Sequence, residues 1–409
     1  MNRRMDRTKL NIGAYILQPY ARSEEHIKDV KESGTDFIVC MENDRAALDL
    51  FEKYNLGAVV TGVRPAWWGG DGDKAGQLSE INPIEKYKEA SDNFIDHPAI
   101  WGIDMGDEPS ALDFPYYGKV INKCNKWFPC QFPYLNLYPN YASVAVNNDV
   151  QTVNQLGTKT YKEHIEEYCK NVPLDYLCYD FYVYSCNVTK YYENLEIVTD
   201  ACRKTGRSMW IVLQVNSVKE GVYLSENNLR FQAFSSMAFG AENIIWACYT
   251  AGWWYHNVLD TEGNKTEQYE KLKKVNFEIK ALADEYMRYR NVDTHFIGFG
   301  ESEDIKLCER KSIDSLNTGT FFDFKAENGE KLVIGQMVGR KNSNQALMVF
   351  AADDLEGTNT KSFYLTFKAL EDANIMAYGI NGAIPVLRQN DGSYKVKITT
   401  NEGLLITLK

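Results

Sequence analysis

Short apolar runs alternate with amphipathic segments along the first 288 residues of the chain. The amphipathic segments, such as EEHIKDVKES and RAALDLFEKYN, place apolar residues at helical spacing, and several stop at Gly or Asn, as helices do. The apolar runs are typical of buried strands. They are LNIGAYIL (10–17), TDFIVCM (35–41), LGAVVTGV (56–63), AIWGIDMGDE (99–108), FPYLNLYP (132–139), LDYLCYDFYVY (174–184), SMWIVLQV (208–215) and NIIWACYT (243–250).

Eight strands, each followed by a helix, predict an α/β fold of the (β/α)8 barrel type. A doubly wound open sheet is the competing arrangement, but no Gly-rich phosphate turn follows the first strand. From residue 292 onwards the pattern changes to closely spaced strands, separated by turn sequences such as NDG (390–392) and NEG (401–403). We therefore predict a catalytic or substrate-binding barrel over 1–289 and an accessory β-sandwich over 290–409.

The fourth predicted strand ends in three carboxylates, Asp104, Asp107 and Glu108, and Pro109 then closes the corner. Alternate residues of a barrel strand face the axis. Strict alternation from Asp104 points Glu108 into the barrel and Asp107 towards the helices, unless a bulge intervenes. Glu108 is then expected at the C-terminal mouth, where barrel enzymes keep their chemistry.

The same alternation predicts which other side chains reach the mouth. Asn136 and Tyr138 point inward from the fifth strand, Asp180 and Tyr182 from the sixth, and Gln214 from the seventh. Aromatic loops add further faces for stacking on sugar rings. The predicted substrate-binding residues are Asn136, Tyr138, Tyr182, Gln214, Trp67, Trp68, Trp246, Trp253 and Trp254.

The composition of the chain limits the kinds of partner that we expect it to bind. Aromatic residues make up 13% of the chain, 26 of them tyrosines, and the net charge is −11. That charge disfavours nucleic acid. The carboxylates, amides and indoles expected around one mouth favour an oligosaccharide or glycoside as the partner. No apolar stretch is long enough to span a membrane. The sequence does not indicate an oligomeric state.

No metal or cofactor is expected, because the five histidines are far apart and lack metal-binding spacing. The nine scattered cysteines are read as mostly buried free thiols, which favours a reducing compartment. No signal peptide is visible, so the sequence as written predicts a cytoplasmic protein. It would be periplasmic or secreted if the N-terminus was trimmed.

Four motifs resemble glycoside hydrolases of the clan A barrel type: GDEP, YLNLYP, YDFY and LRFQAFSSMAFGAENIIW. Over residues 8 to 290 the chain is most similar to β-galactosidase-like enzymes and their uncharacterised bacterial relatives. The resemblance implies an acid/base glutamate closing strand four, which is Glu108, and a nucleophilic glutamate closing strand seven. At that second position this sequence has Gln214, and an amide is no nucleophile at neutral pH.

Three alternatives address the missing nucleophile. In the first, Asp180 serves as base or nucleophile opposite Glu108. Alternatively, Asp107 and Glu108 act as the Asp-Glu pair of β-hexosaminidases does, with the aspartate orienting a 2-acetamido group of the substrate. In the third alternative the site binds sugar without cutting it. We predict a glycoside hydrolase with catalytic residues Glu108, Asp180 and Asp107.

Overall fold

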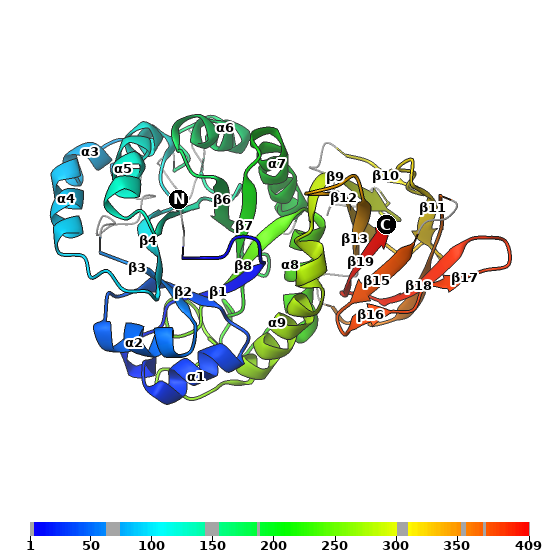
Figure 1. Ribbon diagram of the computed structural model, residues 1–409, viewed down its shortest axis with the longest axis horizontal. Helices are drawn as coiled ribbons and strands as arrows, with labels where there is room; N and C mark the ends of the chain where they lie inside the picture. Colours follow the sequence, from blue (N-terminus) through cyan, green and yellow to red (C-terminus); the bar gives the residue numbers. More distant parts are fainter. Residues whose placement is uncertain are drawn as a thin grey trace.

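The computed structural model describes residues 4–62, 74–143, 155–185, 189–300, 310–352, 357–370 and 374–408. Eight parallel strands close into a barrel in sequence order, with helices around the outside (Figure 1). The predicted (β/α)8 barrel is thereby confirmed. The strands are β1 (Asn11–Tyr15), β2 (Phe37–Met41), β3 (Gly57–Val60), β4 (Ile100–Asp107), β5 (Phe132–Leu137), β6 (Tyr176–Asp180), β7 (Ser208–Gln214) and β8 (Ala241–Ala247).

The helices follow the strands as the amphipathic segments predict. Several begin at a side chain that accepts a backbone N–H, which satisfies an otherwise unpaired donor. Thr160 and Glu163 form a capping box at one helix, and Ser225 and Asn228 form another. The helices are α1 (Glu24–Glu32), α2 (Arg45–Lys53), α3 (Leu78–Ile81), α4 (Ile84–Asp92), α5 (Phe114–Trp127), α6 (Tyr161–Asn171), α7 (Thr189–Thr205), α8 (Glu226–Ala238) and α9 (Glu267–Tyr286). In the described part of the chain no helix is long and apolar enough to cross a membrane.

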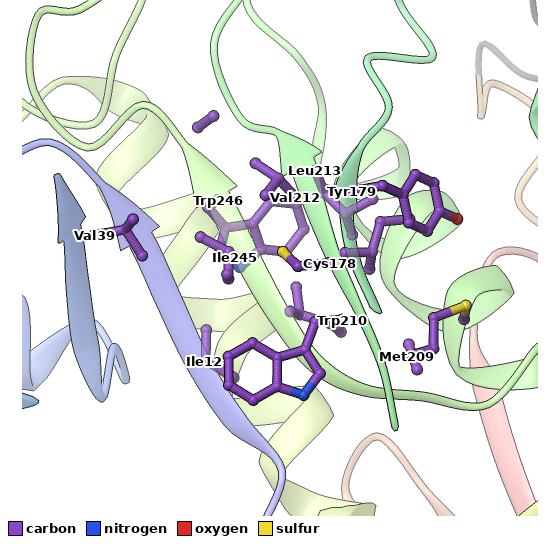
Figure 2. Close-up of a cluster of buried hydrophobic side chains, with 14 of the residues drawn as sticks. Ile12, Val39, Cys178, Tyr179, Met209, Trp210, Val212, Leu213, Ile245 and Trp246 are labelled. Carbon is purple, nitrogen blue, oxygen red and sulfur yellow. The ribbon is translucent and has the colours of Figure 1, made fainter. Parts of the chain in front are cut away.

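Aromatic rings fill the N-terminal half of the barrel. Trp210 of β7 stacks on Tyr176 of β6 with ring centroids 4.1 Å apart, and Phe132 of β5 meets Trp210 edge-on. The Arg7 guanidinium lies 5.3 Å from the Trp210 ring, so the N-terminal segment covers this end. Figure 2 shows Trp210 within a buried cluster that joins β1, β2, β6, β7 and β8. The opposite, C-terminal end is the mouth.

Two further sheets follow the barrel and pack face to face, as the predicted sandwich requires. Apolar side chains of both sheets form their common core. One sheet contains, in spatial order, β10 (Ser312–Ile313), β9 (Tyr289–Ile297), β12 (Leu332–Gly339), β13 (Gln345–Ala351), β19 (Gly403–Leu408), β15 (Ile375–Gly379) and β16 (Gly382–Ile384). The other contains β11 (Phe321–Ala326), β14 (Ser362–Ala369), β18 (Tyr394–Thr399) and β17 (Leu387–Arg388).

The larger sheet also packs against helices α8 and α9 of the barrel (Figure 1). Phe231 of α8 meets Phe350 of β13 edge-on, with ring centroids 5.5 Å apart. Gly335 of β12 permits the close approach, because a Cβ atom there would lie 2.1 Å from the carbonyl oxygen of Ala238. The barrel and the larger sheet therefore share one continuous apolar core.

Candidate functional site at the barrel mouth

A β-bulge in β4 decides which carboxylates face the barrel. Asp104 pairs with Tyr134 and Gly106 with Leu135, so Met105 is an extra residue on β4. After the bulge Gly106 faces the helices, since a Cβ atom there would lie 2.3 Å from the phenol oxygen of Tyr117 on α5. The strict alternation expected from the sequence is therefore wrong beyond Asp104. Gly106 points outward.

Asp104 supports this bulge. Its side chain is only 1% exposed, and its Oδ1 accepts the N–H of Gly106 at 3.2 Å, directly after the bulge. The Cys40 thiol contacts the other oxygen, Oδ2, at 3.4 Å. Asp104 is thus a structural group, and the bulge that it supports helps to turn Asp107 inward.

Asp107 faces the barrel interior, where Asn136 of β5 joins it to Asp180 of β6. The Asn136 amide nitrogen donates to Asp180 Oδ1 at 2.7 Å and to Asp107 Oδ1 at 3.1 Å. Because both oxygens contact one nitrogen, they are no farther apart than the sum of these two distances. Three neighbouring strands therefore converge on one buried amide.

Glu108 completes the group of carboxylates, although by a different route from the one alternation predicts. Its backbone adopts a left-handed conformation, with φ of 44°, and its N–H donates to the Asn136 carbonyl at 2.9 Å. The Glu108 carboxyl group is half-buried and hydrogen-bonds to Asp180. A non-glycine residue in this conformation is strained, and such strain concentrates at functional sites.

The electrostatic consequence is clearest at Asp180, whose side chain is 2% exposed. Burial, followed by the nearby charge of Asp107, raises the pKa of Asp180 to about 7, although hydrogen bonds from Asn136 and Glu108 act in the opposite direction. A hydrogen bond between two carboxyl groups requires a proton on one of them. The Asp180–Glu108 pair therefore holds a proton close to neutral pH.

A chain of buried polar groups below the carboxylates fixes the position of Asn136. The hydroxyl groups of Tyr15 and Tyr134 are 2.7 Å apart, and Tyr134 lies 3.5 Å from the Cys178 sulfur. The Cys178 thiol in turn contacts Asn136 Oδ1 at 3.5 Å. Burial, followed by the charge of Asp107, raises the pKa of Tyr15 well above its usual range, so its phenol stays neutral.

Sequence reasoning missed Tyr15, although alternation from Gly13 could have found it. The inward parity predicted for Asn136 and Asp180 also holds for Tyr134 and Cys178 on the same strands, and the structure buries both inside the barrel. Among the described residues no group of His, Cys, Asp and Glu side chains could hold a metal ion, and no cysteines are paired in a disulfide.

Gln214, at the end of β7, lies in a different environment. Its side chain is fully buried: Oε1 accepts the N–H of Tyr184 at 3.1 Å, and Nε2 donates to the Asn216 carbonyl at 3.0 Å. Gln232 of α8 pairs with both the N–H and the carbonyl of Gln214 at 2.9 Å. Gln214 therefore ties two loops of the mouth to α8 and has no exposed surface for a substrate.

Aromatic side chains stand beside the carboxylates. Trp253 lies 6.0 Å from Tyr15 and 6.3 Å from Tyr182, measured between ring centroids. Trp254 meets Tyr182 edge-on at 4.9 Å and is 36% exposed. The Trp253 carbonyl accepts a hydrogen bond from the Asn216 amide at 2.7 Å, so the loop after Gln214 also holds this aromatic group.

Two predicted contact residues lie elsewhere. Trp246 is buried and donates its indole N–H to Asn276 of α9 at 2.9 Å, because its position in β8 faces the helices. Tyr138 is buried against the His164 ring of α6, since the chain leaves β5 after Leu137. These two expectations are corrected. Trp67 and Trp68 lie outside the described residues.

No family model and no curated protein matches the chain. Solved structures do match. A cycloisomaltooligosaccharide glucanotransferase from Paenibacillus sp., complexed with cycloisomaltoheptaose, covers 98% of this chain with 85% of its own, at 8% identity and a TM-score of 0.57. This likeness shows the fold alone.

Two further matches score lower. Xylanase 10B from Thermotoga maritima covers 66% of this chain with 95% of its own, at 15% identity and a TM-score of 0.43. The catalytic module of a family 98 glycoside hydrolase from Streptococcus pneumoniae covers 100% of both chains, at 9% identity and a TM-score of 0.43.

Proposed function

We propose that this chain is a glycoside hydrolase whose site is the group of Asp107, Glu108 and Asp180 around Asn136. The observation that carries the proposal is the convergence of Asp107 and Asp180 on one buried amide, with Glu108 hydrogen-bonded to Asp180. Glycosidic bond cleavage needs one carboxyl group that is protonated and another that is ionised, at a short separation. This group supplies both. The substrate is an oligosaccharide or glycoside, and the β-sandwich is an accessory domain.

Each carboxyl group has a distinct role in the proposal. Glu108 is half-buried and donates the proton to the glycosidic oxygen. Asp180 is buried, and it shares that proton and keeps it available near neutral pH. Asp107 is oriented by Asn136 and, in its ionised form, faces the positive charge that develops on the sugar.

The test is hydrolysis of a panel of aryl glycosides that includes hexosides, pentosides and N-acetylhexosaminides. We expect Glu108→Gln to lower kcat/KM on the best substrate by about 1,000-fold, because the proton donor is lost. Glu220→Gln, at an exposed glutamate of the β7–α8 loop, is the matched control and should leave the rate unchanged. Equal rates for Glu108→Gln and the unsubstituted chain would exclude Glu108 as the acid. Turnover restricted to N-acetylhexosaminides would assign Asp107 to orienting the 2-acetamido group.

A second candidate is a carbohydrate-binding protein that does not cut sugar. The observation in its favour is Gln214, which occupies the position of the expected nucleophile with its amide fully hydrogen-bonded. This reading predicts sugar binding at the mouth without hydrolysis of any substrate in the panel. The proposed enzyme instead turns over at least one of them.

A further inference from the structure

Exposed apolar side chains gather on the loops around the mouth. Among the described residues eleven large apolar side chains are exposed to solvent, and five of them lie on the β1–α1, β7–α8 and β8–α9 loops. They are Tyr20, Val222, Tyr223, Trp254 and Tyr255. Single exposed apolar residues are common on protein surfaces, whereas a group of them marks a binding surface. Because these side chains are exposed, a ligand can reach them.

Two of these loops hold each other in place. Ser217 of the β7–α8 loop and Tyr255 of the β8–α9 loop exchange two backbone hydrogen bonds, at 2.9 and 2.8 Å. His256 Nε2 accepts the N–H of Gly221 at 2.7 Å, and the Tyr223 ring packs against the His256 ring with centroids 4.0 Å apart. The aromatic side chains are therefore presented on a fixed frame, so little conformational entropy is lost when a ligand binds.

The backbone around Tyr255 is strained although the Tyr255 ring is not buried. Trp254 and His256, the residues before and after it, adopt left-handed conformations with φ of 63° and 58°. Such conformations are costly for residues other than glycine and concentrate at functional sites. Burial of Tyr255 does not offset this cost, because the residue is 47% exposed. The strained segment thus displays an aromatic ring to solvent, as a binding residue requires.

The exposed rings are continuous with the buried carboxylates. Trp254 meets Tyr182 edge-on, and Tyr182 lies close enough to Asp180 for the carboxylate charge to add to the effect of burial in raising the pKa of its phenol. On the β1–α1 loop, the Tyr20 hydroxyl oxygen accepts the N–H of Ala251 at 3.3 Å, which places Tyr20 beside the start of the β8–α9 loop. Aromatic side chains therefore lead from Asp180 to the outer edge of the mouth.

This arrangement identifies a carbohydrate chain as the ligand. Sugar rings have apolar C–H faces that stack on Tyr and Trp, and their hydroxyl groups hydrogen-bond to the polar tips of these side chains. A chain whose scissile bond lies at Glu108 would carry its neighbouring sugars across the exposed rings. An apolar protein segment would also pack on such rings, but it has no use for their continuity with Asp180.

We infer that Tyr20, Trp254 and Tyr255 form a platform, here called the aromatic rim, that holds the sugars next to the bond to be cut. The inference rests on the proposed hydrolase and makes its substrate class more specific. The substrate is an oligosaccharide or polysaccharide chain, in place of a glycoside with a single sugar.

The test uses isothermal titration calorimetry on the full chain carrying Glu108→Gln, which should bind substrate without cutting it. The probes are cellohexaose, xylohexaose, mannohexaose and maltohexaose, each compared with its own monosaccharide. We expect at least one hexaose to bind about 100-fold more tightly than its monosaccharide, because only the longer ligand reaches the aromatic rim.

Further substitutions in the Glu108→Gln chain test the aromatic rim itself. Tyr255→Ala removes a stacking face and should weaken hexaose binding roughly tenfold, whereas Tyr255→Phe keeps the ring and should change the affinity by less than about twofold. Tyr20→Ala, on a separate loop, should weaken binding by a factor similar to that of Tyr255→Ala. Phe277→Ala, at an exposed aromatic residue of α9, is the matched control and should change nothing.

The inference is overturned if no hexaose binds more tightly than its monosaccharide, or if Tyr255→Ala binds as tightly as Tyr255→Phe. The two proposals fail separately. A hexaose that needs Tyr255 for binding but is not cut by the unsubstituted chain would contradict the hydrolase alone. A chain that cuts aryl glycosides but binds no hexaose would contradict the aromatic rim alone.

Discussion

The strand ends at the mouth differ in the kind of buried polar side chain that they hold: titratable carboxyl groups at β4 and β6, and a neutral amide at β7. At the ends of β4 and β6, Asp107 and Asp180 share one amide, and Glu108, on a strained backbone, hydrogen-bonds to Asp180. At β7, Gln214 is neutral, and both of its side-chain polar atoms are hydrogen-bonded. The first arrangement costs stability and can move a proton, whereas the second stabilises loops and has no group that titrates. Under the proposed function, the chemistry therefore belongs to β4 and β6, and β7 has a supporting role.

The contrast also explains how the site can do without a strand-seven carboxylate. Asp180 reaches the mouth from β6, next to β5 and its Asn136, and the bulge at Met105 brings Asp107 to the same amide. A nucleophile from β7 would add a further negative charge to the buried group. The amide at Gln214 avoids that repulsion.

The largest effect is expected at Asn136, which holds the group together. Asn136→Ala removes the donor to both Asp107 and Asp180, so the two carboxylates repel each other without compensation. We expect kcat/KM to fall roughly 1,000-fold, about 4 kcal/mol of barrier. Asn243→Ala is the matched control, since Asn243 is similarly buried but bonds Asn11 at the far end of the barrel. Equal losses in both variants would mean that Asn136 acts only through stability.

A smaller effect is expected when the β7 end is made to resemble the β4 end. Gln214→Glu places a carboxylate against the Asn216 carbonyl and removes the donor that now serves it. We expect the free energy of unfolding to fall by about 3 kcal/mol, measured by urea denaturation at pH 7. The exposed Gln77→Glu should be neutral. A gain of turnover in Gln214→Glu would contradict the assignment and favour a barrel that has lost its nucleophile.

The smallest effect is a gain in stability when the β4–β6 group loses a charge. The pKa of Asp180 is higher in the folded chain than in the unfolded one, so the folded state binds the extra proton between about pH 4 and pH 7. The destabilisation of the fold by ionised Asp180 therefore grows as the pH rises through that window. Asp180→Asn should stabilise the fold by about 2 kcal/mol at pH 8 and by less at pH 5. Asp314→Asn, at an exposed aspartate, should show no such trend, and a pH-independent gain at Asp180 would contradict its raised pKa.

Much of the fold could be predicted because each strand and helix leaves a local signature. Apolar runs and helical spacing marked all eight barrel strands, and the turn sequences marked the β-sandwich. The Ser225 cap of α8 is a local signature of the same kind. These features depend on neighbouring residues only, so a single sequence carries them.

The site was less predictable, because it depends on an exception to alternation. Asp104 holds the bulge at Met105 by accepting the Gly106 N–H, and it also contacts Cys40 of β2, 64 positions earlier in the chain; no local pattern records that second contact. Asp107 was expected to face the helices and instead faces Asn136. Gln214 was expected to contact substrate, but its amide is instead hydrogen-bonded to the backbone of Tyr184 and Asn216. Glu108 and Asp180 were correctly expected to lie near each other, since strands four and six end at the same rim.

The central claim is that Asp180 and Glu108 share the proton that catalysis uses, and the most direct test is the pH dependence of kcat/KM in the unsubstituted chain and in Asp180→Asn. The account predicts that kcat/KM of the unsubstituted chain falls above about pH 7, where the pair loses its proton. In Asp180→Asn this fall should move to lower pH, and the rate at pH 7 should drop about 100-fold. Identical pH profiles and rates for the two chains would contradict it.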